Sequence, residues 1–344
     1  MKNFKHIVAI RFSAMGDVAM TVPVIRHLLQ DYPELKLTFV SDKKFAPLFS
    51  EINRCHFVAA DLKGKHSGIF GLYRLFKQIG QTGKIAAIAD LHQVLRTNVL
   101  KFYFRLTGVK IVSIDKGRSE KKKLTSQKNK FLHQLPSGFE RYAEVFRQMG
   151  YPISLNPSAL HYSKLSLPVD ARALFENTIN IGIAPFAKHE EKMYPLQKMK
   201  SVVEEMSKMN IRIFLFGGGN AEQMILEEWQ NEFKGNVFNV AGKYTLQEEL
   251  AIISNLKLMC SMDSANMHLA SLFNVPVVSI WGPTHPFAGF YGWGQHENNI
   301  IDVQINCRPC SVYGNKKCFR GDHACMEQIN PETIIKKIQW NLSK

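Results

Sequence analysis

Residues 256–270, LKLMCSMDSANMHLA, pass from a short apolar run to a stretch with helical spacing. The run Leu256–Met262 is short and bounded by polar residues, which predicts a buried strand. The loop Asp263-Ser264-Ala265 follows at once, and a helix carrying His268, Leu269 and Leu272 continues the chain. A strand that leads directly into a helix is the building unit of a parallel α/β sheet.

The same alternation extends in both directions and predicts two Rossmann-like halves. Prolines interrupt the rhythm in residues 151–168, so we place the domains at 1–165 and 166–330, with a final helix in 331–344. In such α/β domains ligands bind at the carboxyl ends of the strands, which favours a cleft between the halves. The expected strands are Ile7–Phe12, Lys36–Val40, Phe57–Ala60, Ile85–Asp90, Lys110–Ile114, Ile179–Ala184, Ile211–Phe216, Leu256–Met262, Val237–Val240 and Val277–Trp281.

Composition narrows the function classes. The chain has 344 residues and a formal net charge of +15, which favours an anionic partner. No apolar run approaches the roughly 18 residues of a membrane span. The apolar run Ile7–Ile10 stops at Arg11, too early for a signal peptide, so we expect a cytoplasmic protein.

The loop after Leu256–Met262 is suited to a diphosphate. Free N–H groups and the dipole at a helix start favour a phosphate, and the small residues Ser264 and Ala265 let it come close. Asp263 would repel a phosphate, so it orients the loop or caps the helix. His268 either donates to a phosphate oxygen or is a buried histidine with an ordinary structural role.

Three further features follow predicted strands. Lys192 lies in the loop after Ile179–Ala184, where it can neutralise a leaving diphosphate or be a solvated surface lysine. Gly217 and Gly218 follow Ile211–Phe216 and allow close approach by a nucleotide, or form only a tight turn. Glu222 can bind ribose hydroxyls. Asp17 follows the first strand and Gly16, where a carboxylate can accept a proton from an attacking hydroxyl or only cap a helix.

Two segments lie outside this pattern. Residues 116–130 carry seven basic residues against Glu120 alone, which predicts a mobile, positively charged loop on the first domain. Four cysteines lie near the C-terminus, at positions Cys307, Cys310, Cys318 and Cys325. Four thiolates can hold zinc, although only Cys307 and Cys310 have the CxxC spacing.

Taken together, the motifs resemble glycosyltransferase family 9, the ADP-heptose:lipopolysaccharide heptosyltransferases. Residues 11–17, RFSAMGD, resemble the family's R-x-S-x-x-G-D turn, and Asp90-Leu91-His92 with Arg96 resembles its acceptor-side segment. Residues 192–195, KMYP, resemble its K-x-W-P segment with Tyr194 in place of tryptophan. The most specific match is residues 242–246 with 263–270, where Ala265 stands in the place of the commonest glycine.

The resemblance implies a GT-B fold and an inverting, metal-independent transfer of heptose from ADP-heptose to the lipid A inner core of lipopolysaccharide. Asp17 would be the base, and Lys192 with the amides after Asp263 would stabilise the leaving diphosphate. The resemblance implies an anionic glycolipid as the acceptor, so we expect acceptor or inner-membrane contact from exposed cations. These are Arg96, Lys121, Lys122 and Lys123. No cofactor, metal or nucleic acid is expected.

Two other hypotheses account for part of the sequence. The first is a family 9 relative that uses another nucleotide-sugar and another glycan acceptor, because the departures at Tyr194 and Ala265 leave the donor sugar open. The second is a basic, zinc-stabilised nucleic-acid-binding protein, which would account for the net charge and the cysteines. The chain lacks an aromatic and basic recognition motif for nucleic acid, which disfavours the second.

Overall fold

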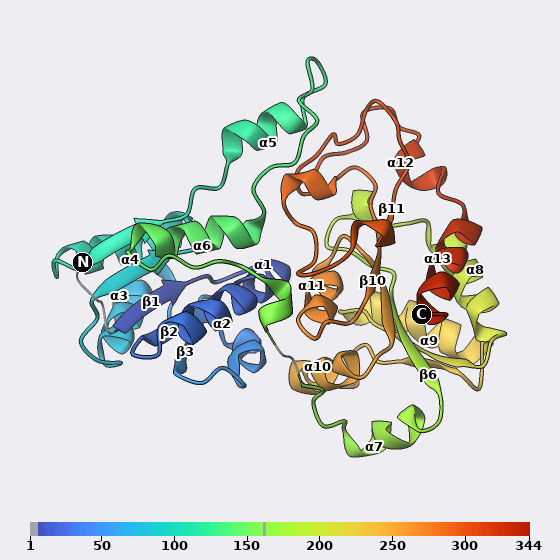
Figure 1. Cartoon of the computed structure of the whole chain (residues 1–344), viewed down its shortest axis with the longest axis horizontal. Coiled ribbons are helices and arrows are strands. Elements are labelled where there is room, and N and C mark those ends of the chain that lie inside the picture. Colours follow the sequence, from blue (N-terminus) through green and yellow to red (C-terminus); the bar gives the residue numbers. More distant parts are fainter. Residues whose placement is uncertain (1–5, 161–162) are drawn as a thin grey trace. The chain divides into compact units, whose positions relative to one another are not determined.

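The computed structural model describes residues 6–160 and 163–344. Its contacts group the chain into two compact units (Figure 1). The first contains residues 1–116 and 138–160, and the second contains 117–137 and 161–344. The domain limits expected from the sequence stay a prediction. No helix in the described ranges is both long enough and apolar enough to span a bilayer.

The first unit is a five-stranded parallel sheet in the order β3-β2-β1-β4-β5. Its strands are β1 His6–Ile10, β2 Lys36–Asp42, β3 Cys55–Ala60, β4 Ala87–Asp90 and β5 Lys110–Ser113. Its helices are α1 Met15–Ala19, α2 Thr21–Asp31, α3 Gly68–Gly80, α4 Leu95–Arg105 and α6 Gly138–Gln148, with the 3-10 segments η1 Lys43–Phe49 and η2 Pro157–Ala159. All five strands predicted from the sequence for this half are present, with ends shifted by one or two residues.

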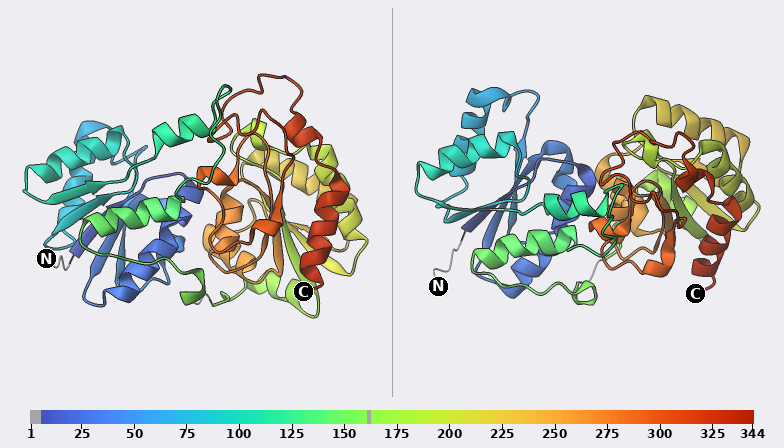
Figure 2. Two further views of the ribbon diagram at one scale, coloured as in Figure 1. Left: turned by 45° about the horizontal axis from the view of Figure 1, so that its top comes forward. Right: turned by 90° about the horizontal axis from the view of Figure 1, so that it is seen from above.

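Side chains that alternate along β1 contact helices on opposite faces of the sheet. Val8 and Ile10 pack in one cluster with residues of α3 and α4, including Leu75 and Leu100. Helices α2 and α6 cover the other face (Figure 2). The expected helix Val18–Gln30 is divided into α1 and α2 because Pro23 has no N–H to continue the helical ladder.

The second unit is a six-stranded parallel sheet in the order β11-β10-β9-β6-β7-β8. Its strands are β6 Ile179–Ala184, β7 Ile211–Leu215, β8 Val237–Asn239, β9 Leu258–Met262, β10 Val277–Ile280 and β11 Ile300–Ile301. Its helices are α5 Arg118–Leu124, α7 Val169–Arg172, α8 Leu196–Ser207, α9 Asn220–Glu232, α10 Leu246–Ser254, α11 Ala265–Ser271, α12 Ala324–Glu327 and α13 Pro331–Leu342. The 3-10 segments are η3 Ala173–Phe175, η4 Glu190–Lys192, η5 Pro286–Ala288 and η6 Glu297–Asn299. The two-residue strand β11 was not predicted, because two residues carry no readable alternation.

Both sheets reverse their strand order beside their first strand. The reversal lies between β1 and β4 in the first unit and between β6 and β9 in the second. Doubly wound α/β sheets bind ligands at such a switch point, outside the carboxyl ends of the strands. The α/β fold with two parallel sheets predicted from the sequence is therefore confirmed.

The basic segment after Lys116 does not form the expected loop on the first domain. Residues 118–124 form helix α5, and the whole segment 117–137 groups with the second unit. Leu124 and Leu135 are buried against Ala288, and the Leu135 N–H donates to the Phe287 carbonyl at 2.9 Å. The prediction was wrong because Leu124 and Leu135 are 11 residues apart, too far to form a recognisable apolar pattern in the sequence. In the fold both pack in the same buried cluster with Ala288.

Candidate functional site

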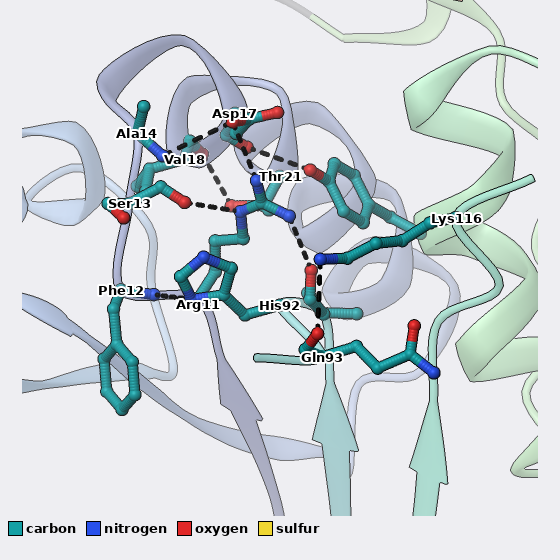
Figure 3. A network of polar contacts seen from close by, with 12 residues as sticks. Arg11, Phe12, Ser13, Ala14, Asp17, Val18, Thr21, His92, Gln93 and Lys116 are labelled. Atoms are coloured by element: carbon teal, nitrogen blue, oxygen red, sulfur yellow. Dashed lines mark hydrogen bonds and ion pairs between the residues drawn. The ribbon is translucent and has the colours of Figure 1, made fainter. Parts of the chain in front are cut away.

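Arg11 organises the switch point of the first unit. Its side chain is 9% exposed, and the guanidinium ion-pairs with Asp17, with 2.7 Å from Nη2 to Oδ2 (Figure 3). Nη1 donates to the Leu91 carbonyl at 2.8 Å and Nε donates to the Ser13 carbonyl at 2.9 Å. One buried cation therefore ties the loop after β1 to the loop after β4 and fixes the carboxylate between them.

Asp17 has the capping role that its position suggested, and its role as a base stays a prediction. It lies in the first turn of α1, and the Ala14 N–H donates to its Oδ2 at 3.3 Å, which is a capping contact. Within the described ranges no polar group contacts its Oδ1, and the side chain is 29% exposed. One oxygen is thus held while the other can accept a proton from a substrate.

His92 is a neighbour of Asp17 that the sequence analysis named only as part of the acceptor-side segment, without a role of its own. It follows β4, and its Nδ1 accepts a hydrogen bond from the Phe12 N–H at 3.3 Å (Figure 3). Burial, and then the charges of Arg11 and Lys116, lower the pKa of His92 to about 4. The ring is therefore neutral at pH 7 with its proton on Nε2, which can donate to a substrate oxygen. The available signal was its place after β4, next to β1 in the sheet.

The acceptor-side motif is divided between a structural and an exposed residue. Asp90 is fully buried, ion-paired with Lys101 at 2.8 Å, and its Oδ1 accepts from the backbone N–H of His92 at 3.1 Å. It shapes the turn that presents His92. Arg96 is exposed on the first turn of α4. Its acceptor contact stays a prediction.

Lys192 and Asp263 meet at the switch point of the second unit. Their side chains form an ion pair, with 2.7 Å from Nζ to Oδ2, and are 14% and 9% exposed. The Thr284 hydroxyl donates to the same Asp263 oxygen at 2.8 Å. Asp263 therefore positions Lys192 and the loop after β10, which agrees with the organising role expected for it.

The cysteine-bearing segment 307–325 packs against the Lys192 side chain at Gly314. Gly314 has a φ of +71°, and a Cβ there would lie 2.1 Å from Cγ of Lys192. The neighbouring Glu191 accepts from the Cys318 N–H at 2.9 Å and faces His323 at 3.3 Å. Only glycine at position 314 leaves space for the lysine stem.

The helix start predicted for phosphate is present but short. Helix α11 begins at Ala265 with Ser264 as its N-cap, and the Ser264 hydroxyl lies 3.1 Å from that of Ser261. His268 is 7% exposed on this helix, which fits the structural alternative for it as well as a ligand contact. Phosphate binding here stays a prediction.

The glycine turn after β7 is closed by Glu222. The Gly218 N–H donates to Oε2 of Glu222 at 2.6 Å, and Gly219 has a φ of +84°. A Cβ on Gly217 would lie 3.2 Å from the same carboxylate oxygen. Glu222 therefore shapes the turn, and its contact with ribose stays a prediction.

The basic residues of 116–130 have unequal surroundings. Lys121 is buried, with its ammonium 4.3 Å from the Phe290 ring centroid. Lys130 donates to the carbonyls of Asn306 at 3.2 Å, Cys307 at 2.8 Å and Pro309 at 3.0 Å. Lys122 and Lys123 are exposed. Of the three lysines expected at the acceptor, these two remain accessible.

The four C-terminal cysteines line one small cavity together with Arg308 and His323. All are free thiols, and burial raises the pKa of Cys325 to about 12. Among the residues that the structure describes, no group of three or more His, Cys, Asp or Glu side chains is arranged to hold a metal ion.

Comparison with known proteins shows the family to which the chain belongs. The family model for glycosyltransferase family 9 (heptosyltransferase) matches residues 73–318, a range that contains Lys192 and Asp263 but not Asp17. The lipopolysaccharide core heptosyltransferase OpsX of Haemophilus influenzae is 24% identical over 82% of this chain and 80% of its own. A lipooligosaccharide heptosyltransferase 2 of Campylobacter jejuni is 22% identical over 100% of this chain and 99% of its own, so the relatives also span the Asp17 loop.

Solved structures share the fold. A family 9 glycosyltransferase from Veillonella parvula superimposes with a TM-score of 0.77 at 21% identity, covering 100% of this chain and 99% of its own. The E. coli heptosyltransferase WaaC with ADP gives 0.69 at 20% identity, covering 98% and 99%. The family model covers well over half of the chain, and both sheets have a doubly wound strand order. This chain therefore belongs to glycosyltransferase family 9, the heptosyltransferase family, and is a glycosyltransferase.

Proposed function

We propose that the enzyme transfers a heptose from ADP-heptose to the lipid A inner core of lipopolysaccharide with inversion at the anomeric carbon. The observation that carries the proposal is the Asp17 carboxylate, which Arg11 fixes through one oxygen at 2.7 Å. Oδ1 accepts the proton of an acceptor hydroxyl as that oxygen forms a bond to the anomeric carbon. The bond from the anomeric carbon to the diphosphate breaks on the opposite face, and ADP leaves.

Lys192 is assigned to the leaving diphosphate. Its ammonium is ion-paired with Asp263 at 2.7 Å, so an incoming diphosphate competes for a cation that is already positioned. Charge that develops on the leaving oxygen is then met by a group that needs no rearrangement. The amides after Asp263 add to this in the proposal, and Glu222 with the Gly217–Gly218 turn binds the nucleoside.

His92 extends the acceptor half of the proposal. Its neutral ring presents a donor on Nε2, since Nδ1 already accepts from Phe12. A donor there orients an acceptor oxygen without competing with Asp17 for the proton. The exposed cations Arg96, Lys122 and Lys123 are assigned to the anionic groups of the glycolipid.

The place of action follows from the acceptor. Because a lipid A precursor is anchored in a membrane, we assign the enzyme to the cytoplasmic face of the inner membrane as a peripheral protein. The names of the H. influenzae and C. jejuni relatives support a lipopolysaccharide or lipooligosaccharide acceptor, and the ADP in the E. coli structure supports an ADP-sugar donor.

The substitution Asp17→Asn tests the base. It retains an oxygen for Arg11 and removes the proton acceptor, so kcat should fall by about 10²–10⁴ while ADP affinity is unchanged. Glu51→Gln, an exposed acid in the same unit, is the matched control and should keep full activity. Turnover by Asp17→Asn within tenfold of the wild type would refute the assignment.

The donor is tested separately by nucleotide binding. Thermal-shift titrations with ADP, GDP, UDP and TDP should rank ADP first. A higher affinity for another nucleotide would favour the family 9 relative with a different donor. That outcome would leave the role of Asp17 intact.

A further inference from the structure

Helices α3 and α4 expose an unusual concentration of large apolar side chains. They pack side by side, with the rings of Tyr73 and Tyr103 in edge contact at 5.4 Å between centroids. Six exposed apolar side chains lie on this pair or directly after α4, and they are between 42% and 84% exposed. These are Ile69, Phe70, Tyr73, Leu95, Phe102 and Leu106.

The spacing of these residues gathers them toward the outer side of the helix pair. In α4, Leu95 and Phe102 are seven residues apart, which is two helical turns, and Leu106 follows one turn later. In α3, Ile69 and Tyr73 are four residues apart. The inward side is already complete, since Leu72, Leu75, Leu100 and other residues pack on the sheet. The exposed set is therefore surplus to the core of this unit.

The same surface is strongly cationic, and the Asp61 carboxylate, which accepts from the Gly64 and Lys65 N–H groups, lies at its edge. From residue 62 to residue 114 the sequence contains one acidic residue, Asp90, and it is buried and paired with Lys101. The exposed cations in this range that lie on or beside the two helices are Lys63, Lys65, Arg74, Lys77, Arg96 and Arg105.

We propose that this α3–α4 face docks on the surface of an anionic phospholipid bilayer. Phe and Leu side chains on a basic amphipathic face enter the boundary between headgroups and acyl chains, and the cations attract anionic headgroups. The proposal rests on the proposed function in that the acceptor is membrane-borne. It assigns the membrane contact to this face, whereas the basic segment 117–130 directs Lys121 and Lys130 into the second unit.

Charge decides between a bilayer and the other occupants. Two copies of this face would bring six exposed cations against six more, which opposes self-association. Nucleic acid would account for the cations but not for Ile69, Leu95 and Leu106, which offer no stacking surface and no hydrogen bond. An anionic bilayer accounts for both groups.

Vesicle flotation with the full chain tests the proposal in the absence of substrates. The wild type should bind vesicles of equal parts phosphatidylcholine and phosphatidylglycerol, with binding weakened by salt, and should not bind phosphatidylcholine alone. The triple variant Phe70→Ser, Leu95→Ser, Leu106→Ser should lose about tenfold or more of this binding. The pair Arg74→Gln, Lys77→Gln should lower it and reduce its salt dependence.

Matched variants sharpen the result. Met224→Ser removes a similarly exposed apolar side chain from the second unit and should leave binding unchanged. Lys122→Gln with Lys123→Gln removes two exposed cations of the basic segment and should have a smaller effect than Arg74→Gln with Lys77→Gln. Because every altered side chain is exposed, the thermal unfolding midpoint of each variant should stay close to that of the wild type.

Three results would overturn the proposal. They are absence of wild-type binding to the anionic vesicles, undiminished binding by the triple variant, and a wild-type dimer that the triple variant dissociates without vesicles. Turnover of a delipidated, water-soluble acceptor distinguishes this proposal from the proposed function. The triple variant should keep full activity there, and lack of heptose transfer by the wild type would count against the function alone.

Discussion

Gly314 provides a test of Lys192 that leaves the lysine itself in place. An alanine at position 314 would bring its Cβ to 2.1 Å from Cγ and 2.2 Å from Cδ of Lys192. Carbon atoms pack at roughly 3.5–4.0 Å, so the middle of the lysine stem must move by about 1.5 Å. The ammonium then leaves its position 2.7 Å from Asp263, and a bound diphosphate loses its aligned cation.

The magnitude follows from the contact that is lost. A hydrogen bond to a charged group contributes about 1.5–3 kcal/mol, so the Kd for ADP should rise by about 10- to 100-fold. Alanine at positive φ also costs about 1–2 kcal/mol of folding stability, which must be separated from the effect on binding. Gly321→Ala is the control, because its φ is +77° and a Cβ there meets no atom within 4 Å.

Isothermal titration with ADP measures both variants beside the wild type and Lys192→Ala. We expect Gly314→Ala to resemble Lys192→Ala, and Gly321→Ala to bind as the wild type does. Equal ADP affinity in Gly314→Ala and Gly321→Ala would show that moving the lysine stem has no consequence for donor binding. The assignment of Lys192 to the diphosphate would then be refuted.

Three further predictions concern pH, stability and metal. The pKa of His92 is about 4 in the fold against 6.5 unfolded, so its contribution is full above pH 6.5 and about 3 kcal/mol is lost as the pH falls to 4. His92→Asn retains an acceptor for the Phe12 N–H, and in this variant the urea midpoint of unfolding should change less between pH 6.5 and pH 4 than in the wild type. An unchanged pH dependence of the midpoint would contradict a buried, neutral His92 ring. Asn330→Ala removes the N-cap oxygen that accepts from the Glu332 N–H at 3.0 Å and should cost about 1 kcal/mol of unfolding free energy, measured by urea denaturation. In the proposed mechanism Lys192 supplies the charge for the leaving group, so dialysis against EDTA should leave heptose transfer unchanged. Activity restored only by added metal would count against that mechanism.

Short-range patterns determined most of the architecture. Ten strands, their order along the chain and the helix after Asn330 follow from apolar runs and caps a few residues long. The positions of Asp17, Lys192 and Asp263 at strand ends were readable for the same reason, because a parallel α/β sheet places every such end at one edge. The relation to family 9 was carried by these local motifs as well.

Contacts between distant parts of the chain were decided only by the tertiary structure. His92 is kept neutral by burial and by the charges of Arg11 and Lys116, and its Nδ1 accepts from the N–H of Phe12, 80 residues earlier. Gly314, 122 residues after Lys192, restricts the position of the lysine side chain. Leu124 and Leu135 pack against Ala288 and so place in the second unit a segment that the sequence predicted as a loop on the first domain. Burial and the distance between remote side chains depend on how the sheets are wound, and no window of neighbouring residues contains that information.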